Sequence, residues 1–433
     1  VDGGGNLYVA GQGYMYFGFG LARYDSLGNL IWSRSFTSGG LWVDQVRGLT
    51  VDSSGVYVGG NRFQQCGCTP TWSETQSGQV VKYGLDGSYQ WAYRTPAVVG
   101  YANSFGVAAD GLGNVFFAVT LYDFAGPSQT TFLKRLSSAG SEVWSHTMTD
   151  NSWSGKLSCR QSDGRLFLVY DWWWYPSQSV RVKQCDPLNG NEVATGDWIV
   201  PQNTYVNSIT GVVVDAGANV YVSGTLTNTA YTDSSMFLVR FPQTLSSTDW
   251  ALVYNTPGSD SAAMNNSADI GSAIPFCGTM NGWQYSGQPC SSPGNSDVLV
   301  RGLSAGGNIL WSTQIDGPSS AEFYDVNSLS GGDVTVVGRD LYVQSVFRYS
   351  SSGSLSWEQA VTAAGHCVNW TGAGAVLGDT TYLPVDGYDL SATYFRDDIL
   401  IVKYDANGSQ IGTIVVPVDS QSSNLGGVAV DAG

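Results

Sequence analysis

Few residues in this 433-residue sequence are of the types that carry out acid–base or nucleophilic chemistry. His146 and His366 are the only histidines, and a serine triad would need one of them beside a nucleophile. Residues 302–306 read GLSAG and match the G-x-S-x-G pattern, but they lie in a turn between two expected strands. The hydrolase pattern requires a strand-to-helix elbow instead. We therefore assign no catalytic residue.

Carboxylates and cations recur at regular intervals, which favours structural roles. Asp2, Asp52, Asp110 and Asp215 each stand almost alone in a turn, whereas a calcium ion prefers several carboxylates in one site. We expect these residues to cap turns, and we expect no metal and no cofactor. One cation in each of several repeats is expected to contact a neighbouring repeat or solvent: Arg23, Lys82, Arg240, Arg301, Arg348 and Lys403.

Aromatic residues are the best candidates for contact with a ligand or partner. Residues 172–175 read WWWY, and alternate residues of a strand face opposite sides, so at least one ring must be exposed or lie between repeats. Exposed aromatic clusters mark protein interfaces and also stack on sugar rings. The alternative is that these rings cover the side of the molecule between repeats. The candidate binding residues are Trp172, Trp173, Trp174, Tyr175, Trp72 and Trp283.

The seven cysteines leave at least one without a partner. Cys277 and Cys290 flank a Gly- and Pro-rich loop and are expected to form a disulfide; Cys66 and Cys68 share another loop. The C-x-C pattern lacks a second cysteine pair and nearby histidines, so no zinc site is expected. Disulfides in loops indicate an oxidising compartment, and free buried thiols in a reducing cell are the alternative.

The other cysteines do not form an evident pair. Cys159 and Cys185 are expected in the first and fourth strands of one repeat, which are not adjacent. Cys367 is the residue left over and is a candidate for a bond to another chain.

These residues are positioned by a repeat that is first seen at residues 21–32, LARYDSLGNLIW. It consists of a strand, a tight turn and a second strand that ends on tryptophan, and its copies or decayed copies recur with a period of about 54 residues. Five copies have a glycine four residues before the tryptophan: Gly28, Gly87, Gly140, Gly307 and Gly353. Tryptophans such as Trp32 and Trp91 are therefore expected to pack between repeats.

A second motif lies between the copies, as in VDSSGVYVGG at residues 51–60 and VDAGANVYVSG at residues 214–224. Asp, Asn and Gly favour tight turns, so each repeat is expected to contain four antiparallel strands and almost no helix. The C-terminal GGVAVDAG, residues 426–433, reads as a first strand without the strands that should follow. We predict one domain over residues 1–433, an eight-bladed β-propeller of four-stranded blades, closed by this segment on the first blade. The alternative is a piece of a longer repeat array.

Taken together, the two motifs resemble the extracellular β-propeller repeat proteins known as SBBP repeats. The resemblance covers nearly the whole chain and implies a secreted or surface module without shared catalytic residues. The G-x-x-x-W spacing also resembles the blades of quinoprotein dehydrogenases, but this chain has no adjacent cysteine pair and no recognisable acid–base set.

Composition agrees with an extracellular β-rich protein. Charged residues make up 12% of the chain, about half the usual share. The net charge of −16 argues against nucleic acid and anionic membranes as partners, and there is no apolar run of membrane-spanning length. Three N-x-S/T sequons are candidates for glycosylation: Asn265, Asn369 and Asn407.

Two functions follow from these features. The first is a non-catalytic extracellular or cell-surface module that contacts other protein subunits or surface glycans through long aromatic loops, which should lie on one face of the ring. The second is an enzyme, either quinoprotein-dehydrogenase-like or polysaccharide-active, with its site on the same face. We expect the first, because no converging set of charged groups is recognisable.

Overall fold

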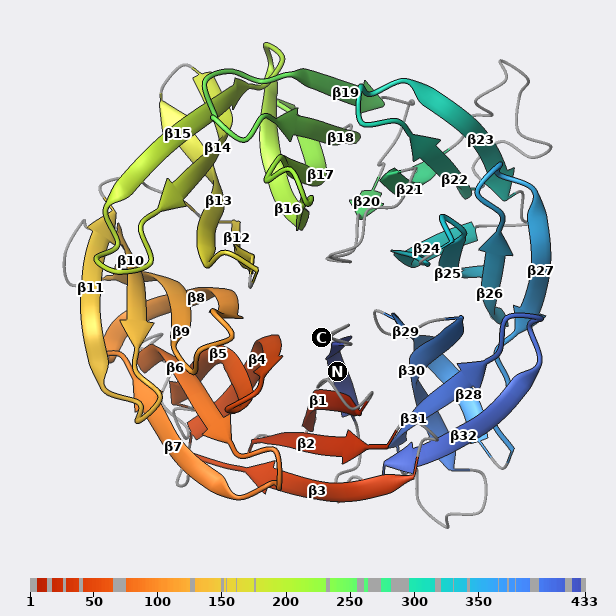
Figure 1. Cartoon of the computed structure of the whole chain (residues 1–433), viewed down its shortest axis with the longest axis horizontal. Coiled ribbons are helices and arrows are strands. Elements are labelled where there is room, and N and C mark those ends of the chain that lie inside the picture. Colours follow the sequence, from red (N-terminus) through yellow and green to blue (C-terminus); the bar gives the residue numbers. More distant parts are fainter. Residues whose placement is uncertain are drawn as a thin grey trace.

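The computed structural model describes residues 6–13, 18–25, 29–38, 42–64, 75–124, 129–148, 152, 154–160, 162–174, 177–230, 234–254, 261–263, 274–281, 296–315, 321–329, 331–340, 343–364, 366–371, 374–377, 379–389, 397–416 and 423–429. Within these residues every regular element is a β-strand, as predicted. The strands form seven hydrogen-bonded sheets around a common axis (Figure 1), which is an all-β propeller fold.

The first two sheets contain the N-terminal strands. The first sheet has the order β3-β2-β1-β33, with β1 (Leu7–Gly13), β2 (Phe19–Tyr24), β3 (Leu30–Phe36) and β33 (Ser423–Ala429). The second sheet contains β4 (Trp42–Asp52), β5 (Gly55–Gln64), β6 (Thr75–Tyr83), β7 (Tyr89–Arg94), β8 (Val98–Ala109), β9 (Val115–Asp123), β10 (Gln129–Leu136) and β11 (Glu142–Met148).

The third, fourth and fifth sheets are each a simple four-stranded meander. The third contains β12 (Gly155–Arg160), β13 (Arg165–Trp174), β14 (Ser177–Cys185) and β15 (Glu192–Ile199). The fourth contains β16 (Thr204–Val214), β17 (Val220–Asn228), β18 (Ser234–Phe241) and β19 (Trp250–Tyr254). The fifth contains β20 (Ser261–Ala263), β21 (Ile274–Asn281), β22 (Ser296–Leu303) and β23 (Ile309–Ile315).

The last two sheets complete the ring. The sixth contains β24 (Ala321–Ser328), β25 (Val334–Asp340), β26 (Val343–Tyr349) and β27 (Leu355–Ala360). The seventh contains β28 (His366–Thr371), β29 (Ala375–Leu377), β30 (Thr380–Asp389), β31 (Asp397–Tyr404) and β32 (Gln410–Val416).

The predicted count of eight four-stranded blades is wrong. Among the described residues, five sheets have four strands, the second sheet has eight and the seventh has five. β6 pairs with β8 at Thr75–Val99 and Gln76–Val98, and this ladder joins two sequence repeats into one sheet. The short strand β29 adds to β30 in the seventh sheet. Backbone hydrogen bonds form wherever strand ends approach each other, and the side-chain pattern of a repeat does not specify such contacts.

The C-terminal segment pairs with the first repeat. β33 runs antiparallel to β1, from the Tyr8–Ala429 pair to the Gly13–Ser423 pair. Figure 1 shows these two strands side by side, with β33 nearer to the axis of the ring. This pairing, which the sequence predicts, covers the inner edge of β1 and closes the ring.

Turn aspartates have the predicted capping role. Asp52 Oδ1 accepts the backbone N–H of Ser54 at 2.8 Å and of Gly55 at 3.1 Å. Asp110 Oδ1 accepts the N–H of Asn114 at 3.1 Å, and Asp215 makes the equivalent bond with Asn219 at 2.8 Å. Asp2 lies outside the described residues.

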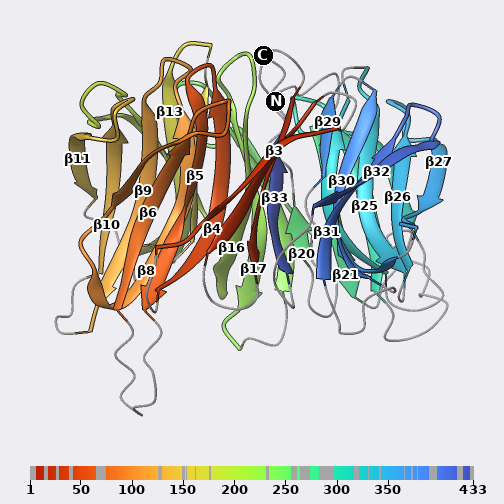
Figure 2. The same ribbon diagram turned by 90° about the horizontal axis from the view of Figure 1, so that it is seen from below.

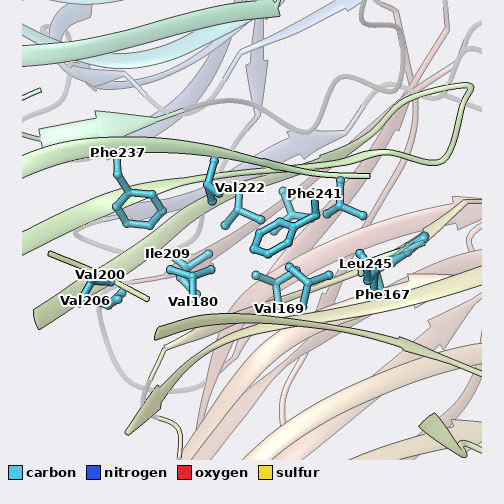
Figure 3. Packing of buried hydrophobic residues seen from close by; sticks show 14 of the residues in the cluster. Phe167, Val169, Val180, Val200, Val206, Ile209, Val222, Phe237, Phe241 and Leu245 are labelled. Atoms are coloured by element: carbon cyan, nitrogen blue, oxygen red, sulfur yellow. The ribbon is translucent and has the colours of Figure 1, made fainter. Parts of the chain in front are cut away.

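The hydrophobic core is divided into layers between neighbouring sheets. Figure 3 shows one such layer, in which Phe167, Val169 and Val180 of the third sheet pack against Val222 and Phe237 of the fourth. Because alternate residues of a strand face opposite sides, each sheet contributes to the layer before it and to the layer after it. A strand such as β9, with Phe116 and Phe117 both buried, is therefore apolar on both faces.

Figure 2 shows the strands running between the two ends of the ring. One end of the ring carries the short turns between strands, such as the β4–β5 and β6–β7 turns. The other carries the β5–β6, β9–β10 and β13–β14 connections, and we call it the loop end. Nowhere in the described chain is there a helix of the length and apolarity that crossing a membrane would require.

Candidate aromatic binding surface

The tryptophan run lies at the loop end of the third sheet. Trp172, Trp173 and Trp174 are the last residues of β13 and pair with Ser179, Gln178 and Ser177 of β14. The side chains of Trp173 and Trp174, and all of Tyr175, Trp72 and Trp283, lie outside the part of the structure that is described. Among the predicted binding residues, Trp172 is the one whose side chain belongs to the described part of the structure.

Trp172 faces the second sheet. It packs against a core cluster that contains Leu168 and Tyr170 of its own strand, together with Phe105 and Phe116 of the second sheet. These β13 residues alternate, as expected for one face of a strand. The Trp172 side chain is partly buried. The expectation that the rings of the tryptophan run cover the junction between repeats therefore holds for the buried part of this side chain.

An ion pair lies over the indole of Trp172. The guanidinium carbon of Arg181 is 3.4 Å from the ring centroid, a cation–π contact. Arg181 Nε and Nη2 donate to the two carboxylate oxygens of Asp197 at 2.7 and 2.8 Å. This bidentate pair fixes the guanidinium and, through it, the orientation of the tryptophan ring.

Three further aromatic rings lie at the loop end of the second sheet. Tyr101 of β8 is directly opposite Tyr122 of β9, and Phe124 follows β9. The Phe124 ring is 5.1 Å from that of Tyr101 and 5.5 Å from that of Tyr122, in both cases edge to face. Its backbone N–H donates to Val99 O at 2.8 Å, which holds the chain in place.

These rings are unusually accessible for aromatic side chains. Tyr101 is 52% exposed and Phe124 is 47% exposed, whereas most rings of this size are largely covered. Sequence reasoning missed them because Tyr101 and Tyr122 are far apart in the chain. Only the strand register brings them together, although the alternation of Tyr122 and Phe124 is a local signal.

The three rings and Trp172 belong to one junction. Tyr122 lies on the same face of β9 as Phe116, which packs in the cluster that also contacts Trp172. The second and third sheets are neighbours in the ring (Figure 1), and both groups lie at the loop end. We call Tyr101, Tyr122, Phe124 and Trp172 the aromatic junction surface.

Three of the repeated cations reach the next repeat, as predicted. Arg23 Nη1 donates to Leu85 O of the next repeat at 2.5 Å, and Lys82 Nζ donates to Ser138 O at 3.4 Å. Arg348 Nη1 similarly reaches Ala406 O at 3.3 Å. Four of the repeated cations also lie over a tyrosine ring of their own repeat: Arg23 over Tyr8, Lys82 over Tyr57, Arg240 over Tyr221 and Lys403 over Tyr382.

The residues with hydrolase-like spacing also have local roles. Ser304 Oγ accepts the N–H of Asn308 at 3.1 Å within the β22–β23 turn, so residues 302–306 form a strand-to-strand turn. His146 lies on β11 opposite Leu133. His366 Nδ1 is 3.2 Å from Ala364 O. The His366 residue also lines a cavity of about 270 Å³. The other residues around this cavity are Val343, Gln344, Ala360, Val361, Thr362, Ala363 and Val368.

The cysteine predictions are tested in part. Cys159 and Cys185 are free thiols on β12 and β14, the first and third strands of their sheet, so the expected fourth-strand position of Cys185 is wrong. Cys277 is buried on β21, while Cys290, Cys66 and Cys68 lie outside the described residues.

Of the sequons, Asn407 has the clearest setting. It is exposed in the β31–β32 turn, where its backbone N–H donates to Asp405 Oδ1 at 2.9 Å. Asn369 and Cys367 both lie on β28, but their side chains are outside the described part of the structure. Asn265 lies outside it entirely.

Comparison with known proteins gives likenesses of fold. No protein-family model matches the chain, and no curated protein matches it. A prolyl endopeptidase structure is 13% identical with a TM-score of 0.48; the match covers 89% of this chain and 49% of that one, so this chain spans about half of its length. The Dos1 propeller is 11% identical over 88% of this chain and 90% of that one, with a TM-score of 0.47. The polysaccharide lyase Uly1 is 12% identical over 79% and 86%, with a TM-score of 0.48. At such identities these structures say nothing of this chain's activity.

Proposed function

We propose that this protein is a non-catalytic binding module whose aromatic junction surface stacks on neutral glycans. The observation that carries the proposal is the edge-to-face group of Tyr101, Tyr122 and Phe124, two of whose rings are about half exposed. Groups of exposed aromatic rings are costly in water and mark interaction sites. Tyrosine also brings a hydroxyl group for hydrogen bonding at the edge of such a contact.

The charge of the protein favours a neutral ligand. With a net charge of −16, the chain repels polyanions over the range of a Debye length. The cation nearest to Trp172, Arg181, is neutralised by Asp197. The surface therefore offers stacking area without net attraction for an acidic polymer.

An extracellular or cell-surface location is part of the same proposal. The exposed sequon at Asn407 supports it, because a tight turn between two strands accommodates a bulky glycan without disturbing a core layer. The intact mass of the protein secreted from a glycosylating host, before and after enzymatic deglycosylation, tests this point. If deglycosylation leaves the masses of both the wild type and an Asn407→Gln variant unchanged, the result counts against glycosylation at that site.

Binding is tested with soluble neutral polysaccharides in affinity electrophoresis and calorimetry. The double variant Tyr101→Ala/Phe124→Ala is expected to lose at least about tenfold in affinity. Tyr89→Ala is the matched control, because Tyr89 is 55% exposed but lies on β7 at the rim. Binding that survives in the double variant, or a wild type that binds no polysaccharide and instead retains a protein partner at the same residues, would overturn the glycan proposal.

A further inference from the structure

The cavity beside His366 lies at a junction far from the aromatic junction surface. Its volume is about 270 Å³, and its lining residues come from the sixth and seventh sheets. At the loop end, β26 begins at Val343, β27 ends at Ala360 and β28 begins at His366. The sixth and seventh sheets are neighbours on the other side of the ring from the second and third sheets (Figure 1).

Backbone hydrogen bonds fix the walls of this cavity. The N–H of Val361 donates to Gln344 O at 2.7 Å and holds the chain beyond β27 against the start of β26. The N–H of His366 donates to Ala363 O at 3.0 Å and closes the turn that leads into β28. Because both connections are tied down, the cavity is a preformed feature of the fold.

The deeper part of the cavity is aliphatic. Val361 and Ala363 are only 5% and 7% exposed, and both belong to a buried cluster with Leu383 and Leu400 of the seventh sheet. Val368 packs against the same cluster. Such a wall favours the apolar body of a ligand, because transfer of apolar surface out of water is favourable.

Polar groups line the same cavity through Gln344, Thr362 and His366. His366 Nδ1 is 3.2 Å from Ala364 O, and since a carbonyl oxygen only accepts, this contact places the proton on Nδ1. The acceptor atom of the neutral imidazole is consequently Nε2. A hydroxyl group on a ligand is the matching donor.

Size and charge narrow the class of ligand. A cavity of roughly 150 Å³ is enough for benzene, and pockets for larger molecules begin near 300 Å³. The volume of about 270 Å³ therefore suits one substituted ring. Among the described residues that line the cavity there is no Asp, Glu, Lys or Arg, and the net charge of −16 disfavours an anion. The ligand should consequently be neutral.

We propose that this cavity binds a small neutral molecule with a ring-sized apolar body and one hydroxyl group, such as a phenol. The body packs on Val361, Ala363 and Val368, and the hydroxyl donates to His366 Nε2. A sugar suits the cavity less well, because an aliphatic wall would take several of its hydroxyl groups out of water without replacing their hydrogen bonds. The site is separate from the glycan contact proposed above, so each proposal stands or falls alone.

Titration with para-fluorophenol and with fluorobenzene, followed by fluorine NMR, tests this assignment. The two probes share an apolar body and differ in the hydroxyl group. The wild type should bind both saturably, and para-fluorophenol about three- to tenfold more tightly, as one hydrogen bond predicts. His366→Leu should remove this preference and keep the affinity for fluorobenzene. Glucose should displace neither probe, and its displacement of both would overturn the ligand class.

A second variant fills the cavity without changing the core. Ala360 is exposed at the rim, so Ala360→Phe should weaken binding of both probes by at least about tenfold. Ile199→Phe is the matched control, because Ile199 ends β15 as Ala360 ends β27, and it is 69% exposed. This control should change affinity by less than about twofold. The filling variant keeps the test valid even if His366→Leu folds poorly.

The other histidine of the chain is an internal reference. In NMR spectra of the imidazole groups, para-fluorophenol should shift the signals of His366 and leave those of His146, on β11 of the second sheet, unchanged. The proposal is refuted by a wild type that binds neither probe or binds both equally. It is also refuted by an Ale-to-Phe rim variant that binds as tightly as the wild type.

Discussion

The indole of Trp32 lies directly against Gly87 of the next repeat, so closely that a Cβ on Gly87 would come within 2.7 Å of Trp32 Cδ2. The same indole donates its Nε1–H to Leu85 O at 2.9 Å. One residue type thus supplies both packing and a hydrogen bond between neighbouring repeats. The contact recurs at other junctions: Trp91 with Gly140, Trp144 with Gly190, Trp250 with Gly307, Trp311 with Gly353 and Trp357 with Gly408.

Replacing Gly87 by alanine should therefore destabilise the ring in two ways. Gly87 has a φ of +81°, which costs an L-residue about 1–2 kcal/mol. The added methyl group must also displace Trp32, which costs roughly 1–3 kcal/mol more. The control is Gly164→Ala, because Gly164 has a φ of +70° and nothing near its Cβ position. Chemical denaturation of both variants measures the difference; equal losses would show that the tryptophan contact adds nothing.

The Arg160–Asp163 pair should make stability depend on pH. Arg160 Nε donates to Asp163 Oδ1 at 2.9 Å, and Arg160 Nη1 reaches Ala216 O of the next sheet at 2.8 Å. The hydrogen bond from Arg160 holds the pKa of Asp163 below its usual range. Because the folded-state pKa is the lower one, this stabilisation is present above the unfolded-state pKa and is lost as the pH falls through the folded-state pKa.

Asp163→Asn is accordingly expected to cost roughly 0.5–1 kcal/mol at neutral pH and much less near pH 2. Thermal unfolding at both pH values checks this. Asp405→Asn serves as the comparison, since Asp405 accepts backbone N–H groups in a turn. If the Asp163 variant and the wild type differ by the same amount at both pH values, the ion pair is not the cause.

Cys159 and Cys185 should be unreactive in the folded protein. Burial raises the pKa of each thiol to about 12, so almost no thiolate exists at neutral pH. Both pair with Leu166, on opposite sides of β13, which places them two strand spacings apart, roughly 9–10 Å. That separation exceeds the reach of a disulfide.

Alkylation with iodoacetamide followed by peptide mass spectrometry tests this prediction. Neither cysteine should be labelled in the native protein at about pH 8, and both should be labelled in denaturant. A disulfide-linked peptide containing both, or rapid native labelling of either, would contradict the arrangement.

The β1–β33 pairing should contribute measurably to stability. Ending the chain after residue 422 removes β33 and uncovers the hydrogen-bonding edge of β1. This truncation is expected to lower the melting temperature, to increase cleavage by protease near β1 and to promote self-association through the exposed edge. Ending the chain after Ala429 keeps the whole of β33 and should behave like the full chain. Identical melting curves for the two truncations would mean that the pairing is not needed.

Local sequence patterns predict the parts of this structure that depend on nearby residues. Strands, capped turns and the position of Trp32 between repeats all follow from motifs about ten residues long. The number of strands per sheet does not, because the Thr75–Val99 contact joins segments whose own sequences carry no signal for it. Cys185 was misplaced by one strand because its repeat lacks the tryptophan that marks the fourth strand elsewhere.

The candidate site was predictable only in part for the same reason. A run of tryptophans is visible at 172–174, and strand alternation predicts that its rings cannot all enter one core layer. The partner rings Tyr101 and Phe124 become visible only when the register of β8 and β9 is known.

The ladder between β6 and β8 has a consequence for local unfolding of the ring. Neighbouring sheets elsewhere in the described ring adhere through side chains, whereas here two repeats share backbone hydrogen bonds at Thr75–Val99 and Gln76–Val98. Residues 42–148 should consequently open as a single cooperative unit in hydrogen exchange, with slow and matched rates across β4–β11. Sub-global opening would then begin at junctions that side chains alone hold, and the eight-stranded sheet would be the last part of the ring to lose its protection.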